Sequence, residues 1–400
     1  MKKILGELSN RELETLDIIQ KKGLITKKSI QAITGMTLTT LNRVMKSLED
    51  KKLIAEAGIS ESTGGRKAVK YDVAQSGIYA IGVDMSRTYV RIVILNLKMT
   101  ILEKKEFFMD DSFSPEKTVE KVGNIIDEGL LKLSIDKSEV LGIGIGTVGP
   151  LDREKGVMLN PKNFFNELWS NVPIRDMFEK RTSLPCFIDN GTNAAVLAEY
   201  LFGKGKDLKN IVYIHCGIGI RSAGINNGII IRTMRDSEDA FAHMVVDFNG
   251  EECTCGNKGC LDSYSSINAI VKSFNSTLKN NNNDTNEEIK EEDYKKILEL
   301  AVNNNKSAVE IINKGAEVLG IGLANMVRIL NPQLVILYGT LIKNYKLYYN
   351  KCIDAFNKSN CLNNDVIFSD GGEFKENAIA VGSGLIVIES YLKKTSIGGK

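Results

Sequence analysis

The segment HMVVDFNGEECTCGNKGCLDSY, residues 243–264, carries the strongest chemical signal in the chain. It holds one of the two histidines, His243, followed by Cys253, Cys255 and Cys260 in a Cys-x-Cys-x4-Cys pattern. Three thiolates and one imidazole complete a tetrahedral Zn²⁺ shell, and four protein ligands leave no open position for a reactive water. The segment therefore predicts a structural zinc site that fixes a strand end to a helix beginning near Leu261. The alternative is a cluster of reduced cysteines without a metal.

The composition places this segment in a large globular chain. The 400 residues are 43% hydrophobic and 26% charged, which indicates two or three domains with real cores. The start, MKKILGELSN, lacks the apolar stretch of a leader, and no run of 18 apolar residues follows, so we expect a cytoplasmic protein that does not enter a membrane. An odd total of seven cysteines favours reduced thiols over a disulfide framework.

Charge is unevenly distributed along the chain. Residues 1–75 contain 14 Lys and Arg against nine Asp and Glu, whereas the remainder is slightly acidic. A basic head on a slightly acidic body suggests a polyanion as partner of the head. The alternative is an ordinary lysine-rich surface in contact with water.

The head, residues 1–75, has the pattern of three short helices and a hairpin. Ser9 or Asn10 can cap a helix that ends at Gly23, and Thr26 opens a second helix that ends at Gly35. Thr37 can cap a third helix. The positions expected to face the core are Leu13, Leu16, Ile18, Ile19, Ile30, Ile33, Leu41, Val44, Met45 and Leu48. Two helices joined by a tight turn that contains glycine are typical of a helix-turn-helix.

The same pattern predicts the surface that would contact DNA. On the third helix, short hydroxyl, amide and cationic side chains face outward, as base edges and phosphates require. The following stretches, LIAEAG, SESTGGRKA and VKYDV, predict a strand, a turn and a strand, as in the wing of a winged helix. The candidate DNA-binding residues are Thr37, Thr39, Thr40, Asn42, Arg43, Lys46, Gly65, Arg66 and Lys67. An incidental helical bundle is the alternative.

From Ile78 onward the chain alternates strands and helices. Buried strands such as LGIGIGTVG and CFIDN end in glycine turns or run directly into helices, which is typical of an α/β protein. Two such blocks predict two lobes with a cleft between them. We expect the first lobe over residues 76–190, completed by a C-terminal helix at about 376–394, and the second lobe over 191–375.

Several of these motifs together resemble the ROK family of repressors and sugar kinases, in its xylose-repressor-like branch. The resemblance rests on YAIGVDMSRT, LGIGIGTVGPLD, NGTNAAVLAEYLFG and the segment 243–264, and it covers nearly the whole chain. It implies an actin-like ATPase fold of two lobes with a sugar site in the cleft. In the repressors of the family it also implies an N-terminal winged helix.

The kinase chemistry of the family does not carry over to these residues. The first phosphate loop of the family has two glycines where this chain has Ser86 and Arg87, and the second has a glycine where this chain has Arg221. The general base of the family corresponds to Gly191, which has no titratable group. We therefore expect no catalytic residue and no ATP binding. The two arginines could instead hold an anionic effector such as a sugar phosphate, or they could face solvent or pair with local carboxylates.

The sugar site implied by the resemblance is also altered. The glutamate of the family's Gly-Glu-x-Gly-His segment is replaced by Ala240, and that of its Cys-Leu-Glu stretch by Asp262. The remaining candidate effector contacts are Asn163, Asn190, His243 and Asp262. A cleft that no longer binds sugar is the alternative.

These inferences predict a DNA-binding repressor of carbohydrate-metabolism genes, such as those of xylose metabolism, with a structural zinc and a catalytically dead, kinase-like body. We expect it to bind an operator as a homodimer or tetramer, because one winged helix buries too little surface for operator-level specificity. One alternative is an active ROK sugar kinase. The other is a regulator with a vestigial cleft that a protein partner controls.

Overall fold

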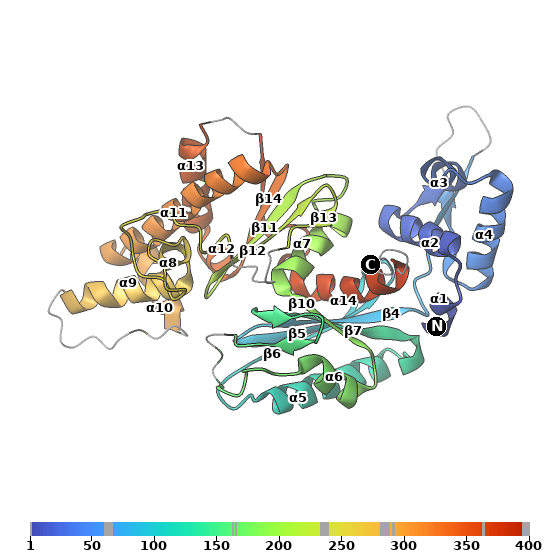
Figure 1. Ribbon diagram of the computed structural model, residues 1–400, viewed down its shortest axis with the longest axis horizontal. Helices are drawn as coiled ribbons and strands as arrows, with labels where there is room; N and C mark the ends of the chain where they lie inside the picture. Colours follow the sequence, from blue (N-terminus) through green and yellow to red (C-terminus); the bar gives the residue numbers. More distant parts are fainter. Residues whose placement is uncertain are drawn as a thin grey trace. The chain divides into compact units, whose positions relative to one another are not determined.

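The structure is a computed structural model that describes residues 2–59, 67–161, 164, 166–232, 240–280, 289, 293–361 and 365–393. The chain forms two compact units, shown in Figure 1: unit 1 comprises Met1–Phe202 with Ile379–Lys400, and unit 2 comprises Gly203–Ala378. The second lobe was expected to begin at residue 191, but the helix Gly191–Phe202 lies in unit 1. In the described part of the chain, no helix is long and apolar enough to cross a membrane.

Unit 1 begins with a winged helix-turn-helix head (Figure 1). Its strands form a three-stranded antiparallel sheet in the order β1-β3-β2. The elements of the head are α1 (Lys2–Gly6), α2 (Asn10–Lys22), β1 (Ile25–Thr26), α3 (Lys27–Thr34), α4 (Leu38–Asp50), β2 (Ile54–Ile59) and β3 (Val69–Val73).

The helix boundaries in the head follow from local hydrogen bonds, as the sequence predicted. Ser9 and Glu12 form a reciprocal capping box at the start of α2, and the Thr37 hydroxyl accepts a hydrogen bond from the Thr40 backbone at the start of α4. The predicted core positions of α4 are all buried. Ile33 was wrongly expected to face the core; it is 54% exposed, because the short helix α3 places only Ile30 fully inside.

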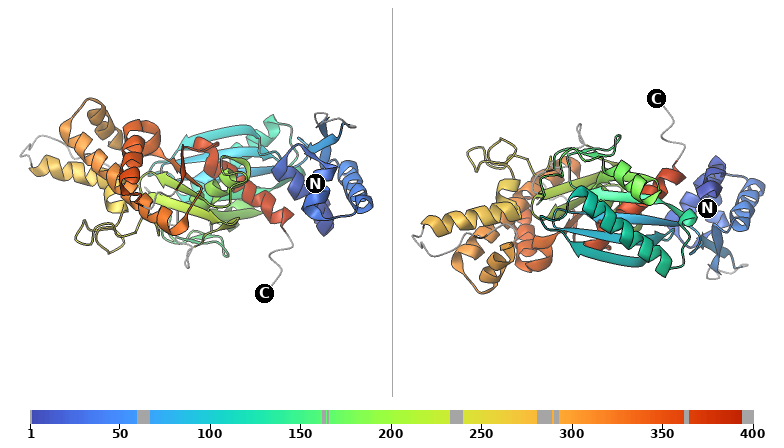
Figure 2. Two further views of the ribbon diagram at one scale, coloured as in Figure 1. Left: turned by 90° about the horizontal axis from the view of Figure 1, so that it is seen from above. Right: turned by 90° about the horizontal axis from the view of Figure 1, so that it is seen from below.

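The rest of unit 1 is a five-stranded sheet in the order β10-β7-β4-β5-β6. Helices α5 and α6 cover one face, and α7 and α14 cover the other, as Figures 1 and 2 show. The sheet consists of β4 (Tyr79–Met85), β5 (Tyr89–Asn96), β6 (Ile101–Phe108), β7 (Val140–Thr147) and β10 (Cys186–Asn190). The helices are α5 (Pro115–Lys132), α6 (Ile174–Thr182), α7 (Gly191–Phe202) and α14 (Ala378–Leu392), and β8 (Leu151–Asp152) pairs with β9 (Val157–Met158).

Unit 2 has its own five-stranded sheet, in the order β13-β12-β11-β14-β15. Its strands are β11 (Ile211–Cys216), β12 (Ile220–Asn226), β13 (Ile229–Ile230), β14 (Leu334–Tyr338) and β15 (Ile367–Asp370). Its helices are α8 (Asp262–Ser265), α9 (Ile267–Asn280), α10 (Tyr294–Val302), α11 (Lys306–Leu330), α12 (Thr340–Asn344) and α13 (Lys346–Ser359).

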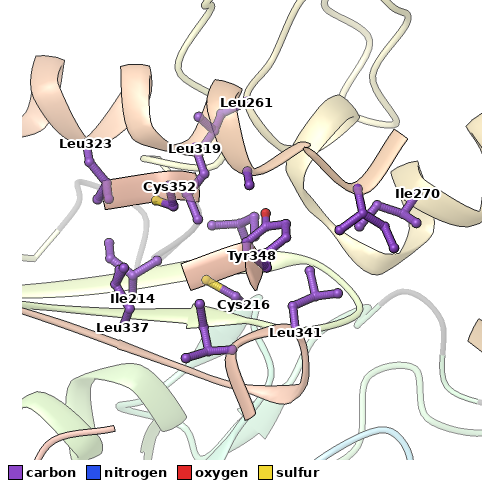
Figure 3. Packing of buried hydrophobic residues seen from close by; sticks show 14 of the residues in the cluster. Ile214, Cys216, Leu261, Ile270, Leu319, Leu323, Leu337, Leu341, Tyr348 and Cys352 are labelled. Carbon is purple, nitrogen blue, oxygen red and sulfur yellow. The ribbon is translucent and has the colours of Figure 1, made fainter. Parts of the chain in front are cut away.

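The core of unit 2 lies between one face of this sheet and its helices. Figure 3 shows Ile214, Cys216 and Leu337 from the strands beneath Leu319 of α11 and Cys352 of α13. The alternate strand positions belong to the opposite face, because strand side chains alternate. The register pairs His215 with Arg221 on one side and with Tyr338 on the other, so these three residues share that opposite face.

Candidate DNA-binding, metal and effector sites

Helix α4 presents a polar surface opposite its buried stripe. Leu41, Val44, Met45 and Leu48 are buried, whereas the side chains on the other face are open to solvent. The exposed residues are Thr37, Thr39, Asn42, Arg43 and Lys46, and Thr40 is half-buried. Lys27 Nζ lies 3.4 Å from Oδ1 of Asn42, which adds a further cation beside the helix. This surface has the hydrogen-bonding groups and positive charge that DNA binding requires.

The predicted wing begins on the paired strands β2 and β3. Of the candidate wing residues, Lys67 is exposed beside β3, whereas Gly65 and Arg66 lie outside the described residues. Lys27 Nζ, the cation beside Asn42, also lies 5.2 Å from the ring centroid of Tyr71 and is therefore close to this sheet as well.

The four candidate metal ligands converge on one point in unit 2. The ligand atoms of His243, Cys253, Cys255 and Cys260 all lie within 4.8 Å of one another. Cys253 Sγ is 3.5 Å from His243 Nδ1, and Cys255 Sγ is 3.6 Å from Cys260 Sγ. A tetrahedral zinc with Zn–S bonds of about 2.3 Å requires sulfur separations of about 3.7 Å. The donor set and these separations both fit Zn²⁺.

Two tight turns bring these ligands together. The Cys253 N–H donates to the carbonyl of Asn257, and Gly259 adopts a φ of +68° beside the carbonyl of Asp247. A Cβ at residue 259 would lie only 1.5 Å from that carbonyl oxygen, so only glycine fits this position. Burial, together with the neighbouring thiols of Cys255 and Cys253, raises the pKa of Cys260 to about 12. A cation at this point would favour the thiolate form.

Asp84 is the penultimate residue of β4, at the position of the family's first phosphate loop, and is engaged within unit 1. Tyr89 Oη donates a 2.9 Å hydrogen bond to Asp84 Oδ2, and Arg91 Nη1 lies 3.6 Å from the same oxygen. Arg91 is 8% exposed and also pairs with Glu106 across β5 and β6, at 2.5 Å. The Ser86 N–H donates to the carbonyl of Tyr89, so this loop closes on itself. The Asp84 carboxylate and the Ser86 backbone N–H therefore both bond to other groups of unit 1.

The position that corresponds to the general base is also closed. Gly191 begins α7, and a Cβ added there would lie 3.2 Å from Cγ2 of Ile379 and 3.3 Å from its Cδ1. The preceding Asn190 is fully buried, and its Oδ1 accepts hydrogen bonds from the backbone and hydroxyl of Thr192. Asp189 Oδ1 accepts from Asn193 Nδ2 at 3.0 Å. These groups stabilise the start of α7.

In unit 2, the corresponding glycine loop lies between β11 and β12. The Ile220 N–H donates to Oδ1 of Asp262 at 2.7 Å, so this carboxylate fixes the loop. Arg221 follows directly and is 7% exposed, and its Nε has no hydrogen-bond partner in the part of the chain that the structure describes. His215 lies opposite Arg221 on the neighbouring strand.

The candidate effector residues are distributed over both units. Asn190 belongs to unit 1, whereas His243 and Asp262 belong to unit 2, and Asn163 lies outside the described residues. His243 has Nδ1 directed at Cys253, and Asp262 has one oxygen engaged by the glycine loop. Each of the three described residues therefore already has a structural contact.

Sequence reasoning missed the residues that neutralise Asp84. Arg91 is a single cation within the apolar strand YVRIVILN, and the β4–β5 register places it directly opposite Asp84. A charged residue in an otherwise buried strand, opposite a carboxylate on the adjacent hairpin strand, is the signal that could have identified the pair.

Comparison with known proteins agrees with this architecture. Residues 80–389 match the ROK family, and residues 8–55 match a winged helix-turn-helix DNA-binding domain. The chain is 28% identical over 390 residues to the xylose repressor of Bacillus spizizenii, which covers 96% of each chain. It is 32% identical over 267 residues to a glucokinase of Thermotoga maritima, which covers 65% of this chain and 81% of the kinase.

The solved structures include a ROK family transcriptional regulator described as a homologue of the Escherichia coli MLC protein. It superposes with a TM-score of 0.75 and 23% identity over 96% of both chains. The fold and the matches together define a DNA-binding regulator whose body has the ROK architecture. The chain belongs to the ROK family.

Proposed function

We propose that this protein is a sugar-responsive transcriptional repressor that binds operator DNA through α4 and the wing, and that its ROK body senses a sugar instead of phosphorylating it. The observation that carries the proposal is the exposed polar face of α4, with Asn42, Arg43 and Lys46, on a head joined to a body whose Asp84 is already paired. The match to a xylose repressor over 96% of both chains supports a pentose effector and target genes of xylose metabolism.

Binding to DNA tests the proposal most directly. The full chain should bind a duplex from the region upstream of its own gene more tightly than a duplex of the same length and composition in shuffled order. Specific protein–DNA complexes exceed non-specific ones by about 10³ or more at physiological salt. Equal affinity for the two duplexes would exclude an operator-binding function. We propose a homodimer as the binding species, with a tetramer as the alternative that sedimentation on the duplex would reveal.

The inactivity of the body is supported by the neutralised Asp84 and by the Ile379 side chain against Gly191. A phosphoryl-transfer site needs free carboxylate or backbone donors for the metal and phosphates, and a base within reach of the sugar hydroxyl. The competing function is an active sugar kinase, which the glucokinase relative makes worth testing. Incubation of the full chain with ATP and D-xylose or D-glucose should yield no sugar phosphate above the rate without protein.

We propose zinc as the ion of the His243, Cys253, Cys255 and Cys260 site, in a structural role. Three thiolates and an imidazole are the donors that Zn²⁺ prefers, and four protein ligands leave no catalytic position. The ion would hold the start of α8 to the preceding loops.

We propose Asn190, His243 and Asp262, together with Asn163, as the first positions to test for the sugar effector. A second candidate, an anionic sugar such as a sugar phosphate, is favoured by Arg221, because a buried guanidinium whose Nε finds no hydrogen-bond partner among the described residues is costly. Calorimetric titration with D-xylose and with a pentose phosphate distinguishes the two. Binding of neither ligand would favour a vestigial cleft controlled by a protein partner.

A further inference from the structure

Helix α14 touches two functionally different parts of unit 1 with its two ends. Its 15 residues, Ala378–Leu392, span about 22 Å at about 1.5 Å per residue. One end lies at the position of the missing base, and the other contacts the DNA-binding head.

At its first turn, α14 lies against the strand ends that carry the family's catalytic position. A Cβ at Gly146 would lie 2.7 Å from Cγ2 of Ile379, and a Cβ at Gly191 would lie 3.2 Å from the same atom. Ile379 is 4% exposed, so it fills the space between β7 and the start of α7. A change in this space acts directly on the first turn of α14.

The first half of α14 packs on the sheet with backbone against backbone. A Cβ at Gly82 would lie 1.8 Å from the carbonyl oxygen of Ala380, and a Cβ at Gly144 would lie 1.8 Å from that of Ser383. Because backbone atoms make these contacts, a displacement of the helix at one end cannot be taken up there by rotation of side chains. Such close packing favours movement of α14 as a rigid body.

The last turn of α14 is ion-paired with the head. Glu389 is 7% exposed, and its Oε1 lies 3.0 Å from Nζ of Lys21 at the end of α2. The same carboxylate pairs with Lys393 at 2.5 Å. The neighbouring Gln20 is 4% exposed and donates from Nε2 to the carbonyl of Leu97, at 3.0 Å. The end of α2 is thus fixed to the body by buried polar groups.

The start of α2 is in turn bonded to the recognition helix. Glu12 Oε1 accepts hydrogen bonds from Ser47 Oγ at 2.5 Å and from Lys51 Nζ at 2.7 Å, at the end of α4. Helix α2 therefore contacts α14 through Lys21 and contacts α4 through Glu12.

We propose that α14 transmits the state of the effector site to the DNA-binding head, through Ile379 at one end and the Glu389–Lys21 ion pair at the other. This inference rests on the proposed function. A ligand changes DNA affinity only if it favours one of two arrangements of the protein. Movement of the first turn of α14 would alter the ion pair, and α2 would pass the change to α4.

A double-mutant cycle on the full chain tests this route. Ile379→Ala perturbs the first turn without requiring a known ligand, and Glu389→Gln removes the carboxylate that pairs with Lys21. Lys393→Gln is the matched control, because it removes the outer partner of Glu389 and leaves the α2–α14 pair in place. Operator affinity is measured by fluorescence anisotropy, and amide hydrogen exchange in α2 and α4 is measured without DNA.

We expect Ile379→Ala to change the operator Kd by about fivefold or more in the parent chain and in Lys393→Gln, and by less than about twofold in Glu389→Gln. Hydrogen exchange in α2 should change in the same pattern. Equal fold-changes in all three backgrounds would overturn the route, and so would unchanged exchange in α2. If the parent chain fails to bind DNA, the proposed function fails, but the exchange experiment still decides the coupling. If the Ile379→Ala variant does not fold, the same measurements are made with Ile379→Val.

Discussion

Tyr89 donates a hydrogen bond of 2.9 Å from its hydroxyl to Oδ2 of Asp84, at the point where the kinases of the family begin their first phosphate loop. The same oxygen lies 3.6 Å from Arg91, whose guanidinium stands 5.1 Å from the centroid of the Tyr89 ring. A tyrosine and an arginine thus satisfy the carboxylate from within the hairpin β4–β5. In this arrangement Oδ2 of Asp84 is engaged by two side chains of unit 1.

The first prediction concerns restoration of the missing base. Gly191→Asp alone should give no detectable phosphorylation of D-xylose or D-glucose from ATP, because Ile379 crowds the new side chain and Asp84 stays paired. Gly191→Asp combined with Ile379→Val removes the Cδ1 part of the crowding and should also remain inactive. Sugar phosphate formed by either variant at a rate of about 1 s⁻¹, as in working kinases, would show that the phosphate site is intact.

The second prediction concerns DNA recognition by α4 and the wing. Arg43→Ala should weaken operator binding by ~1–3 kcal/mol and relax specificity, because its exposed guanidinium can bond to base edges. Lys67→Ala should weaken binding to all DNA sequences by a similar factor. It should also reduce the slope of log K against log salt concentration by about 1. Anisotropy titrations at several salt concentrations measure both effects. Arg11→Ala, which removes an exposed cation at the start of α2, is the control and should change neither quantity.

The third prediction concerns the metal. The purified chain should carry about one zinc, and Cys255→Ser should lower both zinc content and thermal stability, since metal binding and local folding are coupled. Cys361→Ser removes another exposed cysteine, outside the cluster, and should keep the full metal content. Elemental analysis and thermal unfolding give the two readouts. A Cys255→Ser protein with one zinc per chain would contradict the ligand set.

The fourth prediction concerns the pH dependence of the head. Burial alone would raise the pKa of Glu12, but hydrogen bonds from Lys51, Ser47 and Ser9 outweigh it and lower the pKa to about 2. Because the folded pKa lies below the ordinary value, the ionised carboxylate stabilises the head above about pH 4.5, and this stabilisation is lost as the pH falls toward 2.

Glu12→Gln should therefore cost about 1–2 kcal/mol of unfolding free energy at pH 6, and the difference from the parent should shrink at pH 3.5. Urea unfolding at the two pH values measures this difference. Glu14→Gln, at an exposed position of the same helix, should behave like the parent at both. A penalty for Glu12→Gln that is equal at pH 6 and pH 3.5 would show that the charge of Glu12 does not stabilise the head.

The sequence by itself determined the helices α2, α3 and α4 of the head and the four residues of the candidate metal site. Caps such as Ser9 and Thr37 and turns such as Gly35 act within a few residues, so each helix of the head could be predicted from its own segment. His243 and Cys253, Cys255 and Cys260 lie within 18 consecutive positions of the chain, so their spacing sufficed to predict one site.

Only the tertiary structure decided what surrounds Gly191, at the position of the family's general base, and how the head is attached to the rest of unit 1. Ile379 meets Gly191, and Glu389 meets Lys21, because α14 from the end of the chain packs into unit 1. Such contacts depend on how distant elements pack, and no local propensity or periodicity encodes them. For the same reason, the exposure of Ile33 was mispredicted, since the apolar period of α3 does not show how much of that short helix its neighbours cover.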